Sequence, residues 1–207
     1  MSRLEKFDVN GIKGVIHHGG DAFIVCCHGL YSSKESRKFV EMAQRAAEYG
    51  IGCVRFDFRG CGESEGEFSY KPEERLSDLE EVMKWLMKKY SNASYTLFGS
   101  SLGGMVSIKY ASKHEVNALV TIATPYEFEI AGYRASVAGD VERCSHILIM
   151  HGLEDELVPK EHAEMIFTKA REPKKIIFFK TDHRFSDDGE RSKAIDEALK
   201  WIKKFLE

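Results

Sequence analysis

The sequence predicts an α/β fold, in which a doubly wound, mostly parallel sheet carries helices on both faces. A short continuous apolar run at 22–27, and a mostly apolar stretch at 116–122, are typical of parallel strands that are buried on both sides. Amphipathic patterns with helical spacing, such as 72–90, separate these runs. Strands that alternate with helices in this way favour a parallel sheet covered on both faces. With 207 residues, 43% of them hydrophobic, the chain 1–207 fits a single domain.

The first half of the chain is expected to supply a hairpin, two parallel strands and two helices. Apolar residues alternate along 5–18 around two glycines, as in a β-hairpin. The elements that follow are strand 22–27, helix 35–49 closed by Gly50, strand 53–58 and helix 72–90. The glycine-rich loop 59–66 does not favour a nucleotide site, because no helix begins at these glycines to receive a phosphate.

The second half continues the alternation of strands and helices. An apolar run enters the segment 95–104, and a helical pattern leaves it. The elements beyond are expected to be strand 116–122, an irregular stretch 124–144, strand 146–150, helix 161–170, strand 175–179 and helix 191–206. In a doubly wound sheet the carboxyl ends of the strands share one edge, so the loops at these ends are expected to carry the active groups.

Charge and cysteine usage indicate which partners and which cellular compartment to expect. The formal net charge is −3 without a basic block, so no nucleic-acid partner is expected. No apolar run approaches membrane-spanning length, and the charged segment 1–6 does not resemble a secretion signal. The five cysteines lack metal-type spacing and indicate buried thiols in a reducing, cytoplasmic compartment. No metal is expected, because adjacent His17 and His18 point to opposite faces of a strand.

The segment 95–104 presents a serine at a sharp turn between a strand and a helix. A serine at such a corner crowds the positions two before and two after it, which therefore favour glycine. Ser101 has Gly99 and Gly103 at these positions, whereas Ser100 has a phenylalanine and a leucine. Ser101 is therefore the candidate nucleophile, and the free N–H groups of the following helix favour negative charge there. On its own, the pattern also fits a glycine-rich turn with incidental serines.

A serine nucleophile needs a base within hydrogen-bond reach and a carboxylate that orients this base. His183, just beyond the last expected strand, is the candidate base. Asp155, just beyond the strand before it, is the candidate acid, with Glu154 and Glu156 as alternatives. His162 is an alternative base, although the helical pattern around it indicates a surface residue.

These motifs together resemble the α/β-hydrolase superfamily over nearly the whole chain. In chain order Ser101, Asp155 and His183 match the family's nucleophile, acid and histidine. Three further stretches are similar to family loops, namely 151–159 to the acid loop, 57–64 to the loop after the fourth strand and His28-Gly29 to the oxyanion loop. The resemblance favours Asp155 over the neighbouring glutamates. It is closest to small esterases and acyl-peptidase-like hydrolases that have a minimal cap.

The resemblance also implies an oxyanion hole made of two backbone N–H groups. One is that of Leu102, directly after the nucleophile. The other is that of Leu30, with Tyr31 as the one-residue alternative. His28 and Arg59 are expected to hold their loops in place and to take no chemical step.

The expected activity is hydrolysis of a carboxylic ester with a short or medium acyl chain through an acyl-enzyme. The substrate would be a small molecule, and neither a metal nor an organic cofactor is expected. A thioesterase and an acyl-peptidase or amidase are the alternatives within the class. A non-catalytic binding protein of the same fold is the alternative from a different class. A homodimer is left open.

The cap-like segment, about 124–145, is too short for a lid domain, so a fairly open site is expected. Large apolar and aromatic residues of this segment and of two loops earlier in the chain are the candidates for an apolar substrate pocket. They are Tyr31, Tyr126, Phe128 and Tyr133, together with Ile130, Phe68 and Tyr70. The same side chains could instead close the edge of the core.

Overall fold

The computed structural model describes residues 3–206, so Met1 and Ser2 of the segment 1–6 lie outside it, as does Glu207. Ten strands and six helices are described. In chain order they are β1 Leu4–Val9, β2 Ile12–His17, β3 Ala22–Cys27, α1 Arg37–Glu48, β4 Gly52–Phe56, α2 Pro72–Lys89, β5 Ser94–Ser100, α3 Leu102–Ala111, β6 Ala118–Ile122, β7 Glu127–Ile130, β8 Tyr133–Ser136, α4 Ala138–Val141, β9 Ile147–Gly152, α5 Glu161–Lys169, β10 Lys174–Phe179 and α6 Asp188–Lys203. None of the helices described combines the length and the apolar character needed to cross a membrane.

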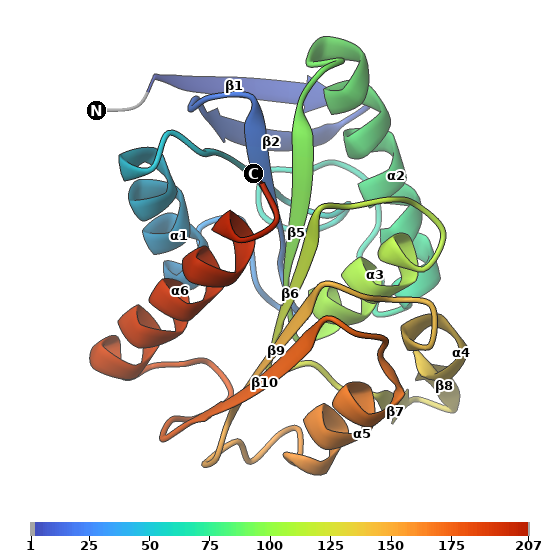
Figure 1. Ribbon diagram of the computed structural model, residues 1–207. Coiled ribbons are helices and arrows are strands. Elements are labelled where there is room, and N and C mark those ends of the chain that lie inside the picture. The colour runs from blue at the N-terminus through green and yellow to red at the C-terminus, as the bar shows by residue number, and fades with distance from the viewer. Residues whose placement is uncertain (1–2, 207) are drawn as a thin grey trace.

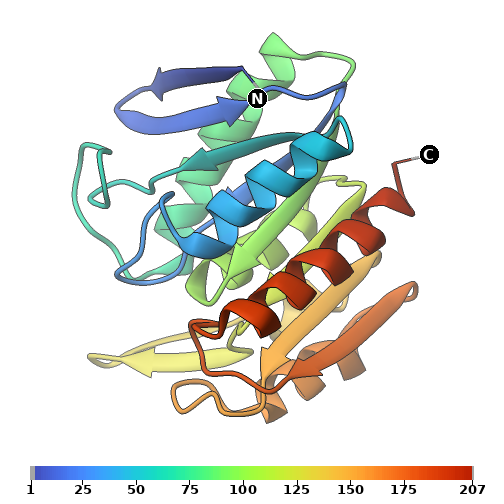
Figure 2. The same cartoon turned by 90° about the vertical axis from the view of Figure 1, so that its left-hand side faces the viewer.

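Eight of the strands form one sheet in the order β1-β2-β4-β3-β5-β6-β9-β10. The hairpin β1–β2 is antiparallel and adds to β4 in antiparallel register, whereas all pairings from β4 to β10 are parallel. Helices α1 and α6 cover one face of this sheet, and α2, α3 and α5 cover the other (Figures 1 and 2). The prediction of a doubly wound, mostly parallel sheet with helices on both faces is confirmed.

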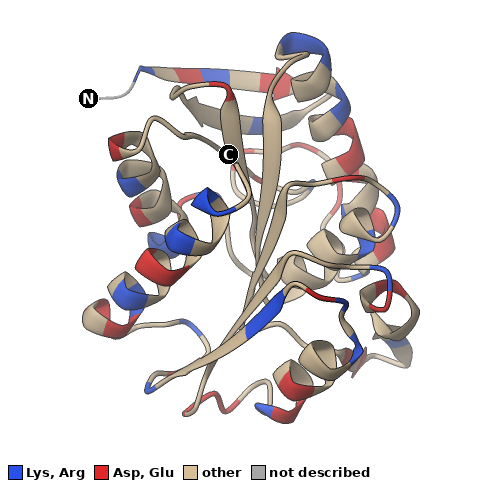
Figure 3. Cartoon of the chain, viewed as in Figure 1, with Lys and Arg blue, Asp and Glu red and all other residues tan. Residues whose placement is uncertain are grey.

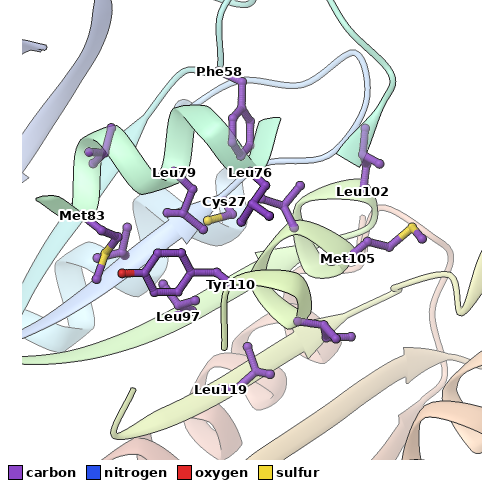
Figure 4. Close-up of a cluster of buried hydrophobic side chains, with 14 of the residues drawn as sticks. Cys27, Phe58, Leu76, Leu79, Met83, Leu97, Leu102, Met105, Tyr110 and Leu119 are labelled. Carbon is purple, nitrogen blue, oxygen red and sulfur yellow. The ribbon is translucent and has the colours of Figure 1, made fainter. Parts of the chain in front are cut away.

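The central strands feed two hydrophobic clusters, one on each face of the sheet. Successive side chains of a strand alternate between faces. On β5, accordingly, Leu97 joins the cluster beneath α2 and α3, and Phe98 joins the cluster beneath α1 and α6. Figure 4 shows the first cluster, where side chains of α2 such as Leu79 meet Tyr110 of α3. This double burial explains why the strands read as continuous apolar runs. Charged residues lie mainly on the helices and outer strands (Figure 3).

The stretch 124–144 is not irregular, contrary to the prediction from sequence. It forms the antiparallel hairpin β7–β8 and the short helix α4. The two residues at the turn, Ala131 and Gly132, both have positive φ angles, of 51° and 77°. A two-residue hairpin loop needs such angles, and it is normally recognised by Asn-Gly or Asp-Gly. Because alanine stands at the first turn position, the sequence Ala131-Gly132 lacks the residue pair by which such a hairpin is recognised. The hairpin lies near the carboxyl ends of the parallel strands (Figure 2).

Candidate active site

Ser101 occupies a strained corner between β5 and α3. Its φ of 53° and ψ of −122° are rarely adopted by a residue other than glycine. A Cβ atom on Gly99 would come within 2.5 Å of the Gly103 carbonyl oxygen, and one on Gly103 within 2.0 Å of the Cys27 carbonyl oxygen. The corner therefore requires both glycines. Ser100 is the last residue of β5 and is buried.

The structure brings together the three residues predicted to form a triad. Nε2 of His183 lies 3.1 Å from Oγ of Ser101, and Nδ1 of His183 lies 2.8 Å from Oδ2 of Asp155. An ionised carboxylate can only accept, so Nδ1 carries the proton and donates it to Asp155. Nε2 is then free to accept the hydrogen of the serine hydroxyl. Glu154 and Glu156 are exposed and do not take the place of Asp155.

The carboxylate of Asp155 is fully buried and held by backbone donors. Its Oδ1 accepts from the N–H groups of Leu157 at 2.9 Å and Val158 at 2.8 Å. Burial raises the pKa of Asp155, but the hydrogen bonds from His183, Val158 and Leu157 outweigh this and leave the pKa below its ordinary value. Asp155 is therefore ionised at neutral pH and can orient the ring of His183.

Two further histidines lie near the triad. Nε2 of His151 donates to the Val158 carbonyl at 2.8 Å and lies 3.4 Å from Oδ2 of Asp155. Burial lowers the pKa of His151, so this side chain is neutral and braces the loop after β9 without competing for Asp155. His162 is not a surface residue, as its helical pattern had indicated. It is half-buried, and its Nδ1 accepts the Tyr126 N–H at 3.0 Å.

Two backbone N–H groups near Ser101 correspond to the expected oxyanion donors. That of Leu102 lies in the first turn of α3, where helical N–H groups have no partner within the helix. Leu30 follows Gly29, which packs so closely on the corner that a Cβ there would lie 3.0 Å from Cβ of Ser101. Within residues 3–206 the Leu30 N–H makes no hydrogen bond. Tyr31 is 85% exposed and stacks on Phe68 at 5.3 Å.

The peptide group between Gly29 and Leu30 is fixed from its carbonyl side. The Gly29 carbonyl accepts from Nδ1 of His28 at 2.8 Å and from Nη1 of Arg75 at 3.3 Å. Nε2 of His28 accepts the Phe58 N–H at 3.1 Å, which sets the tautomer of the ring. A trans peptide directs its N–H opposite to its carbonyl, so these two donors aim the Leu30 N–H. The expectation that His28 holds its loop agrees with these contacts.

Arg75 is a supporting residue that the sequence did not single out. It lies in α2, a helix rich in charged residues, where a surface position would be the ordinary expectation. Instead it is 1% exposed, and its Nε donates to the Ser69 carbonyl at 2.8 Å. Burial lowers the pKa of Arg75 from its ordinary value. Arg59, unlike Arg75, was singled out from the sequence as a residue that holds its loop. Its ion pair with Asp78 of α2 agrees with that expectation.

A cavity of about 810 Å³ opens beside Ser101. Of the candidate substrate-binding residues, Tyr31, Phe128 and Ile130 line it, as do the proposed oxyanion residues Leu30 and Leu102. The other candidates, Tyr126, Tyr133, Phe68 and Tyr70, do not line it, which corrects the expectation from sequence. Tyr126, just before β7, packs into the core, and Tyr133 packs against the edge of the core with its ring beside Tyr70 and its hydroxyl bonded to Glu73. In the described part of the chain, no group of three or more His, Cys, Asp or Glu side chains is arranged to hold a metal ion.

Residues 23–143 match the family model for the alpha/beta hydrolase fold, so the chain belongs to this family. A sequence relative is the uncharacterized protein YfhR of Salmonella typhi, 26% identical over 197 residues that cover 82% of this chain. This chain spans 63% of the length of that relative. Protein phosphatase methylesterase 1 of Candida albicans is 30% identical over 98 residues, which are 47% of this chain and 27% of that protein.

Solved structures resemble the fold over nearly the whole chain. An esterase of Pyrococcus furiosus superposes with a TM-score of 0.89 at 16% identity, covering 100% of this chain and 94% of its own. A serine hydrolase without a lid from Xanthomonas campestris superposes with a TM-score of 0.79 at 20% identity, covering 98% and 94%. At these identities the likeness establishes the fold.

Proposed function

We propose that the protein is a serine hydrolase that cleaves carboxylic esters through an acyl-enzyme. The observation that carries this proposal is the hydrogen-bonded chain from Asp155 through His183 to Ser101, which stands at a strained corner beside a cavity. A serine hydroxyl becomes a useful nucleophile when a neutral imidazole can take its proton. The buried, ionised Asp155 stabilises the imidazolium that results.

In the first half-reaction, Nε2 of His183 takes the proton of Ser101 while Oγ bonds to the ester carbonyl carbon. The carbonyl oxygen becomes an oxyanion, and in this proposal the N–H groups of Leu30 and Leu102 stabilise it. Collapse of this intermediate breaks the bond to the leaving alcohol, to which His183 returns the proton. In the second half-reaction a water molecule repeats these steps on the acyl group and releases the acid and free Ser101.

The ester is proposed as the scissile bond because two of the similar proteins are named for esterase activity. These are the protein phosphatase methylesterase, a sequence relative, and the Pyrococcus furiosus esterase, a structural neighbour. Thioester and amide cleavage would use the same steps and remain alternative outcomes of a substrate panel. The five buried, free cysteines fit the proposal that the protein works in the reducing cytoplasm.

A labelled fluorophosphonate and a panel of chromogenic esters, thioesters and anilides test this function. Stoichiometric labelling at Ser101, turnover of esters and loss of both in Ser101→Ala would support it. Ser100→Ala is the matched control and should keep most of the activity, because its side chain lies outside the triad. Folded wild-type protein that neither takes the label nor turns over any ester would instead indicate a non-catalytic binding protein.

A further inference from the structure

The cavity beside Ser101 has two ends with different chemistry. One end is apolar and is formed by Phe128, Ile130 and Leu157. The other lies between the start of α1, the loop after His183 and the start of α6. Four basic residues line it, namely Arg37, Lys38, Arg184 and Arg191. Among the described residues that line the cavity, Glu127 of the hairpin is the one with a carboxylate.

Three of these four cations have no carboxylate partner in the described chain. Arg191 is paired with Glu41 at 2.9 Å and Asp188 at 2.7 Å. Arg37 and Arg184, both exposed, form no ion pair within residues 3–206. Nζ of Lys38 donates to the Arg184 carbonyl at 2.9 Å, and no described carboxylate lies within 4.0 Å of it.

Lys38 is the unusual member of this group because it is only 7% exposed. An ammonium group has three donors, and the structure satisfies one of them with a neutral carbonyl. Burial lowers the pKa of Lys38 to about 8, and the balance includes Asp182 and Asp155, which raise it, and Arg191 and Arg184, which lower it. A buried charge without a close counter-ion is costly. An anion in the cavity would supply the missing partner.

The first turn of α1 adds to the positive potential at this end. It contains no acidic residue, and the side chain of its N-cap, Ser36, makes no capping hydrogen bond. Ser36 itself lines the cavity. The N–H groups at the start of this twelve-residue helix therefore reinforce the field of the basic side chains.

We propose that the site prefers esters that carry a second, negatively charged group, a carboxylate or a phosphate, which Lys38 binds with help from Arg37 and Arg184. This inference rests on the proposed esterase function and names its substrate class. The anionic group would occupy the basic end while the ester carbonyl lies at Ser101. The apolar end would then take the other part of the substrate.

Matched ester pairs test this preference. In the first pair the charge is on the acyl side, as in the 4-nitrophenyl monoester of glutaric acid against its terminal carboxamide. In the second it is on the leaving group, as in 3-acetoxybenzoate against 3-acetoxybenzamide, and a third uses acetoxyphenyl phosphate against acetoxybenzamide. We expect kcat/KM for the anionic member of at least one pair to be higher by about tenfold, which corresponds to about 1.4 kcal/mol. The ratio should fall toward one with rising salt and as the pH rises through about 8, where Lys38 loses its charge.

The ratio should also collapse in Lys38→Met, and it should drop in Arg184→Gln, an exposed position at which folding is not at stake. Lys84→Met removes an exposed lysine from α2, outside the cavity, and should leave the ratio unchanged. A ratio near one in all pairs, or a preference that both variants retain, would overturn the inference while the ester turnover itself upholds the proposed function. If no ester is hydrolysed, the readout is glutarate binding. A rise in the Tm of wild-type protein that is absent in Lys38→Met supports the inference, and no rise overturns it.

Discussion

Gly103→Ala tests how the close packing at the serine corner affects catalysis, because it changes this packing and leaves the three triad side chains in place. The new Cβ would lie 2.0 Å from the Cys27 carbonyl oxygen and 2.6 Å from that of His28. Both obstacles are backbone atoms, so a side-chain rotation cannot relieve the contact. Because real Cβ contacts stay beyond 3.0 Å, α3 and the end of β3 must separate by roughly 1 Å.

This separation acts directly on the proposed oxyanion hole. The end of β3 leads into the loop that carries Leu30, and α3 begins at Leu102, so the two N–H groups move apart. A misplacement of about 1 Å can cost on the order of 100-fold in rate, and we expect kcat/KM for a chromogenic ester to fall by that amount. Overpacking should also lower the free energy of unfolding by about 1 to 3 kcal/mol. Alanine is the better helix former by about 1 kcal/mol, which offsets part of this loss.

The control for this variant is Gly139→Ala in α4, where no atom would lie within 4 Å of the new Cβ. It should leave kcat/KM close to wild type, and it should keep or slightly raise the unfolding midpoint in urea, because alanine is the better helix former. A Gly103→Ala protein with wild-type kcat/KM would refute the reasoning that this glycine sets the distance between the two N–H groups. A protein that loses stability but keeps its activity would show that the strain is relieved away from the site.

Three more outcomes are expected. Asp155→Asn should lower kcat by about 10⁴-fold without unfolding the protein, since the Leu157 and Val158 N–H groups will hold the amide oxygen and turn its NH₂ toward Nδ1 of His183, which moves the ring proton to Nε2. A kcat within tenfold of wild type would exclude this role. Urea unfolding should show stability falling as the pH drops from about 6.5, the ordinary histidine value, toward 4, because burial lowers the pKa of His28 to about 4 and only the unfolded chain takes up the proton in that window. His28→Asn, which keeps a donor toward Gly29, should make that slope shallower without abolishing it, because burial also lowers the pKa values of His17 and His151; an unchanged slope would assign it wholly to other groups. Hydrolysis should favour short, soluble esters without a rate increase when the substrate forms an interface, because the segment between β6 and β9, where a lid would be, holds a hairpin and the short helix α4; strong interfacial activation would contradict this.

The sequence predicted the parts of this fold that follow from local pattern and parallel topology. Apolar runs located the buried strands, and the glycines around Ser101 identified the corner. Asp155 and His183 could be placed near it because the carboxyl ends of parallel strands meet at one edge. The start of the last helix was less accurate. It begins at Asp188 instead of 191, because Asp187 caps it by accepting the Glu190 N–H at 2.8 Å.

Features that depend on contacts between distant segments were missed. The buried positions of Arg75 and Lys38 cannot be read from helices whose neighbouring residues are charged, since burial there depends on carbonyl groups supplied by other loops. The placement of Tyr126 and Tyr133 likewise depends on a hairpin register whose turn lacks the usual residues. A pattern of period two or 3.6 reports which face of an element is buried. It does not report whether another element supplies a polar group that can bind a charged side chain on that buried face.

The same distinction applies within the site itself. Ser101, Asp155 and His183 follow β5, β9 and β10, whose carboxyl ends lie at one edge of the sheet with β6 between β5 and β9. Parallel topology therefore brings the three residues to the same edge, and the loops after β9 and β10 complete the contacts. The orientation of the Leu30 N–H depends instead on the Gly29 carbonyl, which is held from the loop after β3 by His28 and from α2 by Arg75. A change at Arg75 can therefore turn the proposed oxyanion donor without touching the triad. Such a variant would still react at Ser101 but would lose the stabilisation that only the transition state uses, so the loss should appear in kcat and leave KM largely unchanged.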